Sequence, residues 1–162
     1  MQYEKYSKVI ASADRTQFWF ESLGPNGKIK KMVQFTQTLN EDIYNLAFGN
    51  RNKDGSMDDE TTSNNKDRNK ILATVAAIVY EFTAAHPGKK VFFRGSTPGR
   101  NRLYRIAISL NLQTLKKDFH IYGILKGANG FKTVNFRKNT EYFAFLVKRK
   151  RVNLIYETIS KT

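Results

Sequence analysis

Hydrophobic and polar residues alternate along the first fifty residues with the period of two that is typical of strands with one buried face. The clearest case is residues 15–22, where Phe18 and Phe20 fall on one side and Trp19 falls on the other. A turn rich in Gly, Pro and Asn separates this stretch from the next one, which predicts a hairpin. Strands are therefore expected at 3–11, 15–22, 28–37 and 43–49.

The spacing of hydrophobic residues changes in the second half of the chain. Residues 67–85 are apolar nearly all round, which predicts a helix enclosed between other elements, and Pro87-Gly88 ends it. A second helix is expected at 98–111, because its apolar residues recur every three or four positions. Strands are expected at 91–94, 119–126, 131–136 and 142–149. Residues 50–66 are polar and predict a loop without core residues, and the tail at 150–162 has no clear pattern.

The resulting order, ββββ-α-β-α-βββ, predicts an α+β fold with a mainly antiparallel sheet and two helices packed on one face. The length of 162 residues suits a single domain spanning 1–162, and no internal repeat divides it. No stretch reaches the roughly 18 apolar residues of a membrane helix, and the first residues lack the apolar core of a signal peptide. We expect a soluble cytoplasmic protein that does not bind membranes.

Charge is distributed unevenly along the chain. The formal net charge is +14, and residues 1–85 contribute none of it, with 11 Lys/Arg and 11 Asp/Glu. Residues 86–162 contain 17 Lys/Arg and 3 Asp/Glu. A basic half of this kind is typical of proteins that bind a polyanion, most often nucleic acid, although a generally basic surface would give the same count. Cysteine is absent, which excludes disulfides, cysteine nucleophiles and thiolate metal sites.

The stretch 91–108, VFFRGSTPGRNRLYRIAI, joins a short strand to the second predicted helix. Ser96 or Thr97 can cap this helix, and Pro98 suits its first turn. A helix N-terminus presents unpaired N–H groups and partial positive charge, which favour an anion. Arginine side chains suited to phosphate crowd the same junction: Arg94, Arg100, Arg102 and Arg105. We expect Arg100 and Arg102, with backbone N–H groups of the turn, to hold a phosphate; a capped helix with solvated arginines is the alternative.

A second candidate surface is the polar face of the first hairpin. Trp19 shares this face with Lys28 and Lys30, and Arg15 is expected to join them. Aromatic side chains stack on bases and lysines follow phosphates in proteins that bind single strands. The alternative is a Trp19 buried beneath another element. Near the C-terminus, Lys148 and Arg149 begin a basic run that either contacts phosphates or is a solvated strand end.

Residues suited to catalysis or to a cofactor are few. The two histidines, His86 and His120, belong to no recognisable motif. A metal-independent nuclease could still combine His120 with Tyr104 and Arg102, using acid–base chemistry and charge stabilisation. We expect no cofactor and no metal, because the calcium-loop-like residues 50–59 are followed by Thr61 where a calcium loop needs glutamate.

With these residues in view, the sequence resembles a family of short bacterial proteins classified as a domain of unknown function. The most specific part of the resemblance is Gly95-Ser96-Thr97 with Arg100, Arg102, Leu103 and Tyr104, a GSTxxRxRLY motif. Further matches are Gly24, Gly27 and Lys30, the run 44–49, Asn64-Asn65, residues 72–76 and residues 145–150. Similar chains often carry Thr at position 101, where this chain has Asn101. The resemblance implies a small cytoplasmic protein and carries no activity with it.

A more distant similarity concerns residues 3–85. Their predicted ββββ-α order and the stretch Arg15-Thr16-Gln17-Phe18-Trp19-Phe20 resemble Pur-type modules that bind single-stranded nucleic acids. The net neutrality of this half argues against a simple transfer of that function.

These observations favour a protein that binds single-stranded DNA or RNA through an arginine-rich helix start and an aromatic, basic sheet face. A toxin-like or defence-related ribonuclease is the first alternative. An interaction protein whose basic half binds an acidic partner is the second. The oligomeric state stays open, including a homodimer and a complex with a partner protein.

Overall fold

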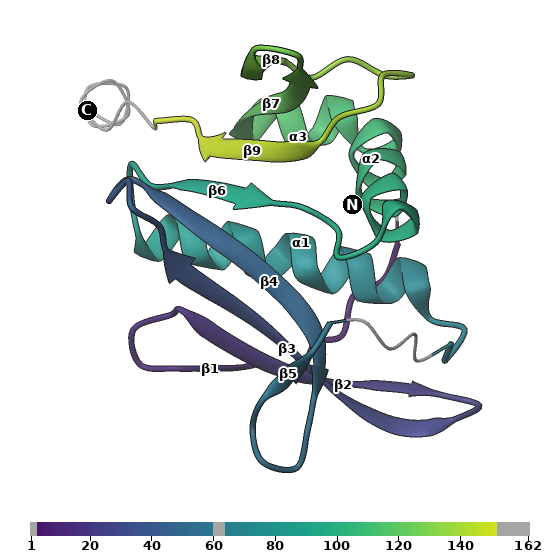
Figure 1. Cartoon of the computed structure of the whole chain (residues 1–162). Coiled ribbons are helices and arrows are strands. Elements are labelled where there is room, and N and C mark those ends of the chain that lie inside the picture. Colours follow the sequence, from purple (N-terminus) through teal and green to yellow (C-terminus); the bar gives the residue numbers. More distant parts are fainter. Residues whose placement is uncertain (1–2, 60–63, 152–162) are drawn as a thin grey trace, which may run out of the picture.

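The computed structural model describes residues 3–59 and 64–151 and has an α+β fold (Figure 1). Within these residues, three helices accompany a mixed, mostly antiparallel sheet of nine strands. The N-terminal strands are β1 (Ile10–Ala11), β2 (Gln17–Gly24), β3 (Gly27–Gln37), β4 (Ile43–Arg51) and β5 (Met57–Asp58). The remaining elements are α1 (Arg68–Ala85), β6 (Lys90–Phe93), α2 (Pro98–Leu110), α3 (Leu112–Asp118), β7 (Phe119–Gly127), β8 (Gly130–Asn135) and β9 (Ala144–Arg149).

Both halves of the chain contribute to the same sheet. Its strand order is β1-β2-β3-β4-β6-β9-β7-β8, and β5 pairs with β4 beside this path. The β4–β6 pair is parallel, and α1 provides the crossover that parallel neighbours require. The order also places β9 between β6 and β7, so the last strand in the described part of the chain lies inside the sheet rather than at its edge.

The helices lie on one face of the sheet. Phe35 of β3 stacks on Phe82 of α1 with ring centroids 4.0 Å apart. Phe93 of β6 meets Tyr104 of α2 edge-on at 5.6 Å. The strand register puts Phe35 and Phe93 on the same face, because each aligns with Leu46 of β4. The predicted packing of helices on one face is confirmed, and within the described residues the opposite face has no helix against it. This helix-free side is called the open face below.

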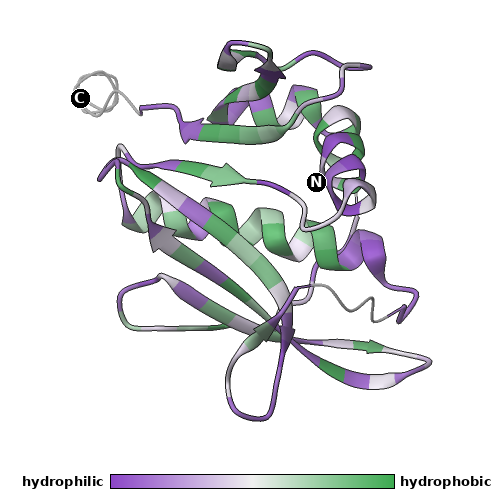
Figure 2. Cartoon of the chain, viewed as in Figure 1, coloured by the Kyte–Doolittle hydropathy of each residue, from purple (hydrophilic) through white to green (hydrophobic). Residues whose placement is uncertain are grey.

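Helix α1 is enclosed, as its composition predicts. Its ribbon is apolar along most of its length and polar at its N-terminal end (Figure 2). Its sheet side packs on aromatic residues, while the N-terminal segment crosses the helix and the Tyr6 N–H donates to Thr74 Oγ1 at 2.8 Å. None of the described helices is long and apolar enough to cross a membrane.

Several boundaries differ from the sequence prediction. The expected strand at 3–11 shortens to Ile10–Ala11, because Tyr6 is buried against α1 instead of pairing in the sheet. The loop at 50–66 contains β5 and the buried Asn65, which is 3% exposed, so the prediction of a loop without core residues was wrong. Helix α3 was not predicted. The tail at 152–162 lies outside the described residues.

Candidate nucleic-acid interface

Two rows of side chains cross the open face on β6, β9 and β7. In the first row, Lys90 aligns with Lys148, which aligns with His120 on its other side. In the second row, Phe92 aligns with Leu146, which aligns with Tyr122. The rows are two residues apart along each strand, so both point to the same side of the sheet. A basic row therefore lies directly beside a row with an aromatic ring at each end. We call these six residues the two-row surface.

Most members of the two-row surface are partly accessible. Lys90, Phe92, Tyr122 and Lys148 are of intermediate exposure, His120 is exposed, and Leu146 is buried at 8%. Five of these six residues thus keep some access to solvent, and Leu146, which lies between Phe92 and Tyr122 in its row, is buried. This arrangement offers stacking surfaces and positive charge at one place.

The predicted hairpin face also forms. Trp19 aligns with Met32, while Lys30 and Lys28 align with Glu21 and Leu23 on the same side. The Arg51 guanidinium lies over the Trp19 ring, 5.4 Å from its centroid. Trp19, Lys28 and Lys30 therefore belong to the open face, on strands separated from β6 by β4.

Two basic residues lie away from this face. Arg15 forms an ion pair with Glu81 of α1, with Nε and Oε1 3.4 Å apart, so its expected place beside Trp19 was wrong. Arg149 follows Lys148 and so points to the helix side. There its guanidinium lies 4.8 Å from the Tyr80 ring centroid and 5.4 Å from that of Phe119. Because successive strand residues alternate in direction, Lys148 and Arg149 cannot contact the same ligand strand.

The Gly95-Ser96-Thr97 turn is held by a defined set of hydrogen bonds. Thr97 is the N-cap of α2, and its Oγ1 accepts from the Arg100 N–H at 3.2 Å. Ser96 Oγ donates to the Asp59 carbonyl at 2.7 Å. The Gly95 N–H donates to Asn101 Oδ1 at 3.0 Å, and Asn101 Nδ2 donates to the Tyr142 carbonyl at 2.8 Å. The predicted cap and the proline at the first turn are confirmed, and Asn101 joins the turn to the segment before β9.

The arginines at the start of α2 separate into two groups. Arg94, Arg102 and Arg105 line a hollow of about 930 Å³ beside the Gly95-Ser96-Thr97 turn, which we call the arginine hollow. The Arg94 guanidinium stacks on Phe143, 3.7 Å from the ring centroid. Arg100 lies on the opposite side of α2 and lines a different hollow. Positions 100 and 102 are about 200° apart around a helix, so Arg100 and Arg102 do not converge on one anion.

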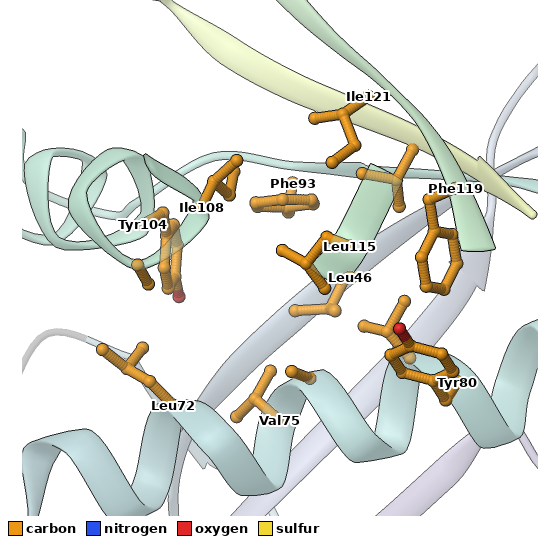
Figure 3. Close-up of a pocket in the computed structure, with 14 residues that line it drawn as sticks. Leu46, Leu72, Val75, Tyr80, Phe93, Tyr104, Ile108, Leu115, Phe119 and Ile121 are labelled. Carbon is orange, nitrogen blue, oxygen red and sulfur yellow. The ribbon is translucent and has the colours of Figure 1, made fainter. Parts of the chain in front are cut away.

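The residues considered for a ribonuclease are not assembled. His120 is on the open face, whereas Tyr104 lies on the helix side, in the space between α1 and the sheet that Figure 3 shows. Burial raises the pKa of Tyr104, and Asp59 adds to this effect while Arg100 opposes it. Arg102 lines the arginine hollow. The space around Tyr104 is a cavity of about 100 Å³ with an apolar lining, which includes Leu46, Leu72, Phe93 and Ile121 (Figure 3). It is a feature of core packing, and the described residues that line it offer no polar side-chain group beyond the tyrosine hydroxyls.

Sequence reasoning missed the hollow that Arg100 does line. Its volume is about 830 Å³, and we call it the Lys31 hollow, since Lys31 lines it while being only 5% exposed. The Lys31 Nζ donates to Asn50 Oδ1 at 2.5 Å and lies 5.8 Å from the Phe48 ring centroid. A signal for this residue was present, because strand alternation places Lys31 between Ile29 and Val33 on the core face.

Charge and burial act together on Lys31. Burial is the largest influence and lowers the pKa of the Lys31 ammonium group. Asp67 opposes this effect, and the positive charge of Arg100 adds to it. The Asp67 carboxylate is itself held, since Oδ2 accepts from the Tyr6 hydroxyl and from Ser22 Oγ, the latter at 2.5 Å.

Comparison with known proteins identifies a family without assigning an activity. The model for a family of unknown function, DUF6934, matches residues 2–150. No curated protein and no solved structure matches the chain. The similarity to Pur-type modules therefore gains no support from these comparisons. Because the family model covers nearly the whole chain, the protein belongs to the DUF6934 family.

Proposed function

We propose that this protein binds single-stranded nucleic acid across the open face of its sheet. The observation that carries the proposal is the two-row surface, where Lys90, Lys148 and His120 lie beside Phe92 and Tyr122. Aromatic rings on a sheet stack on unpaired bases, and neighbouring cations contact the phosphates that link those bases. The two rows are two residues apart along each β-strand, so the stacking row lies next to the basic row. A single-stranded nucleic acid requires this arrangement, because its bases and phosphates must be contacted side by side.

The charges of the basic row support an anionic partner. Like charges directly opposite each other on neighbouring strands destabilise a sheet. The placement of Lys90 opposite Lys148 is therefore unfavourable in the free protein, and a bound phosphate would relieve the repulsion. Core packing gives no reason for such a row, because these side chains point away from the helices.

Groups outside the two-row surface extend the proposed surface. The arginine hollow contains Arg94, Arg102 and Arg105, and guanidinium groups suit phosphate. On β2 and β3, Trp19, Lys28 and Lys30 occupy the same open face at a greater distance from β6. We assign the main contacts with the nucleic acid to the two-row surface. The arginine hollow and the residues on β2 and β3 provide supporting contacts to the phosphate backbone of the nucleic acid.

The alternatives are less well supported. A ribonuclease that uses His120, Tyr104 and Arg102 would need these side chains together, and they lie on different sides of the sheet and helix α2. An acidic protein partner would explain the charge, but it would not require aromatic rings beside the basic row.

The proposal is tested by fluorescence anisotropy with labelled single-stranded RNA and DNA. Tyr122→Leu keeps an apolar side chain but removes the ring, and a lost stack costs about 1–3 kcal/mol, so affinity should fall about tenfold. Lys148→Gln should weaken binding by several-fold. Lys117→Gln, an exposed position on α3 at the helix side, is the matched control and should bind like the parent. Equal affinity for Tyr122→Leu, Lys148→Gln and the parent would reject the two-row surface.

A further inference from the structure

The β7–β8 hairpin carries an exposed aromatic ring at the outer end of the sheet. Strand β8 is the last strand in the sheet order, and the tight turn of the hairpin aligns Gly127 with Gly130 (Figure 1). This register places Phe131 directly opposite Lys126. Phe131 is 62% exposed, so much of this large apolar residue is in contact with solvent.

Phe131 lies on the open face, together with the two-row surface. Lys126 follows Tyr122 by an even number of residues along β7, so both side chains point to the same side of the sheet. Cross-strand partners in an antiparallel pair share a face, which places Phe131 there as well. Tyr122 and Lys126 are about 13 Å apart at the rise of a strand. One base therefore cannot stack on Tyr122 and Phe131 at the same time.

A second ring and two cations surround Phe131. The ring centroids of Phe131 and Phe143 are 4.9 Å apart, with an interplanar angle of 46°. The Arg94 guanidinium lies 3.7 Å from the Phe143 centroid, and Lys126 Nζ lies 5.5 Å from it. We call Phe131, Phe143, Arg94 and Lys126 the hairpin platform. Phe143 and Arg94 also line the arginine hollow, so the platform connects that hollow to the open face.

The composition of the hairpin platform indicates its partner. An exposed phenylalanine by itself is ordinary on a protein surface. Here Phe143 already contacts Arg94 and Phe131, so the accessible ring is that of Phe131. Neither Arg94 nor Lys126 forms an ion pair with a carboxylate in the part of the chain that the structure describes. An accessible ring beside such cations suits an unpaired base with its neighbouring phosphates, as the two-row surface does.

We propose that the hairpin platform is a second stacking site for the strand that crosses the two-row surface, so that the protein selects strands with unpaired bases at both sites. One base stacks on Tyr122, and a base further along the same strand stacks on Phe131. Arg94 and Lys126 contact the phosphates beside the second base. Bases in a duplex are stacked on each other and cannot reach two separate rings without leaving the stack. This inference rests on the proposed function and adds to it the class of strand that is bound.

The test is fluorescence anisotropy with labelled oligouridine and oligothymidine of about 16 nucleotides, the upper end of the site sizes of single-strand binding folds. Phe131→Leu keeps an apolar side chain without a ring and should weaken binding at least about fivefold. Phe131→Trp should bind at least as tightly as the parent. Leu110→Ala is the matched control and should bind like the parent, since Leu110 is 60% exposed at the end of α2 on the helix side. Thermal unfolding of each variant verifies folding.

Comparison with Tyr122→Leu separates this inference from the proposed function. Parent-like binding by Phe131→Leu with weaker binding by Tyr122→Leu would overturn the second stacking site and leave the two-row surface in place. The reverse result would place the strand at the hairpin alone and overturn both, as would a parent protein that binds neither probe.

A duplex arm tests the requirement for unpaired bases. Each labelled strand, annealed to its complement, should bind the parent more weakly than the free strand does. The difference between Phe131→Leu and the parent should then disappear. A duplex that binds as tightly as the free strand and retains this difference would overturn the selection of unpaired strands.

Discussion

Lys90 of β6 and Lys148 of β9 are direct cross-strand neighbours on the open face, and His120 of β7 is the next residue in the same row. Two ammonium groups in this position repel each other. The repulsion has no compensation from the core, because both side chains point away from the helices. The pair therefore links two measurable properties, the stability of the free protein and its affinity for an anionic strand.

We expect Lys148→Gln to raise the free energy of unfolding by about 0.5 kcal/mol, because it removes the repulsion from Lys90. The same substitution should reduce the affinity for single strands. Urea denaturation at low ionic strength measures the first effect, and anisotropy measures the second. A variant that loses stability without losing affinity would show that Lys148 has a structural role instead.

The turn before α2 provides a matched pair of glycine substitutions. A Cβ on Gly95 would lie 2.2 Å from the backbone N of Asn101, a distance that requires the backbone to move. Gly95→Ala should therefore lower the free energy of unfolding by more than about 2 kcal/mol. Gly99 has open space, since the nearest atom to its Cβ would be Thr97 Oγ1 at 3.9 Å.

Gly99→Ala should consequently raise stability by about 0.5 kcal/mol through its better helix propensity. Thermal and urea unfolding of both variants make the comparison. Similar effects at positions 95 and 99 would contradict the close approach of Gly95 to Asn101.

Lys31→Met should raise the free energy of unfolding at pH 7. Burial lowers the pKa of Lys31, so the unfolded chain binds this proton more tightly than the folded protein does. The charged lysine therefore opposes folding at neutral pH, and its cost disappears as the pH rises past the unfolded value of about 10.4.

The advantage of the Lys31→Met variant should accordingly shrink as the pH rises towards the unfolded value of about 10.4, which urea denaturation at alkaline pH can measure. A loss of more than about 2 kcal/mol at pH 7 would instead identify Lys31 as a structural partner of Asp67 and Asn50.

Tyr80 predicts a loss of stability at high pH. Burial, together with the hydrogen bond from the Tyr80 hydroxyl to Asp118 Oδ2 at 2.7 Å, raises the pKa of Tyr80 to about 12. The folded protein thus holds this proton more tightly than the unfolded chain, in which tyrosine titrates near about pH 10. The contribution of the protonated Tyr80 hydroxyl to the free energy of unfolding is complete below about pH 10 and is lost between about pH 10 and pH 12. Tyr80→Phe should lose less stability than the parent over this interval in urea denaturation; an equal loss would contradict the assignment.

Much of the fold could be predicted from local patterns. The alternation around Phe18 and Phe20 gives the first hairpin and its buried face, and the apolar circumference of residues 67–85 gives an enclosed helix. The short helix α3 lacks a clear apolar period, and β5 consists of two residues, so neither has a strong signal.

The candidate site was only partly predictable, because it depends on contacts between distant segments. The sequence identified Lys148 and His120 separately, but their alignment with Lys90 follows from the insertion of β9 between β6 and β7. The short spacing of the arginines in the sequence also led to the wrong prediction that Arg100 and Arg102 bind one phosphate. Arg100 and Arg102 are close in sequence, yet helix geometry turns them to different hollows.

The most direct test of the central claim is the salt dependence of single-strand binding by the parent protein. Cations that bind phosphates release counterions, and the logarithm of affinity for a single strand falls by about 0.7 per phosphate for each tenfold rise in salt. Contacts from Lys90 and Lys148, with at least one more from the arginine hollow, predict a slope of about −2 or steeper as the salt concentration rises from low to physiological values. Binding that is absent at the lowest salt, or an affinity that stays constant across the titration, would contradict nucleic-acid recognition by the open face.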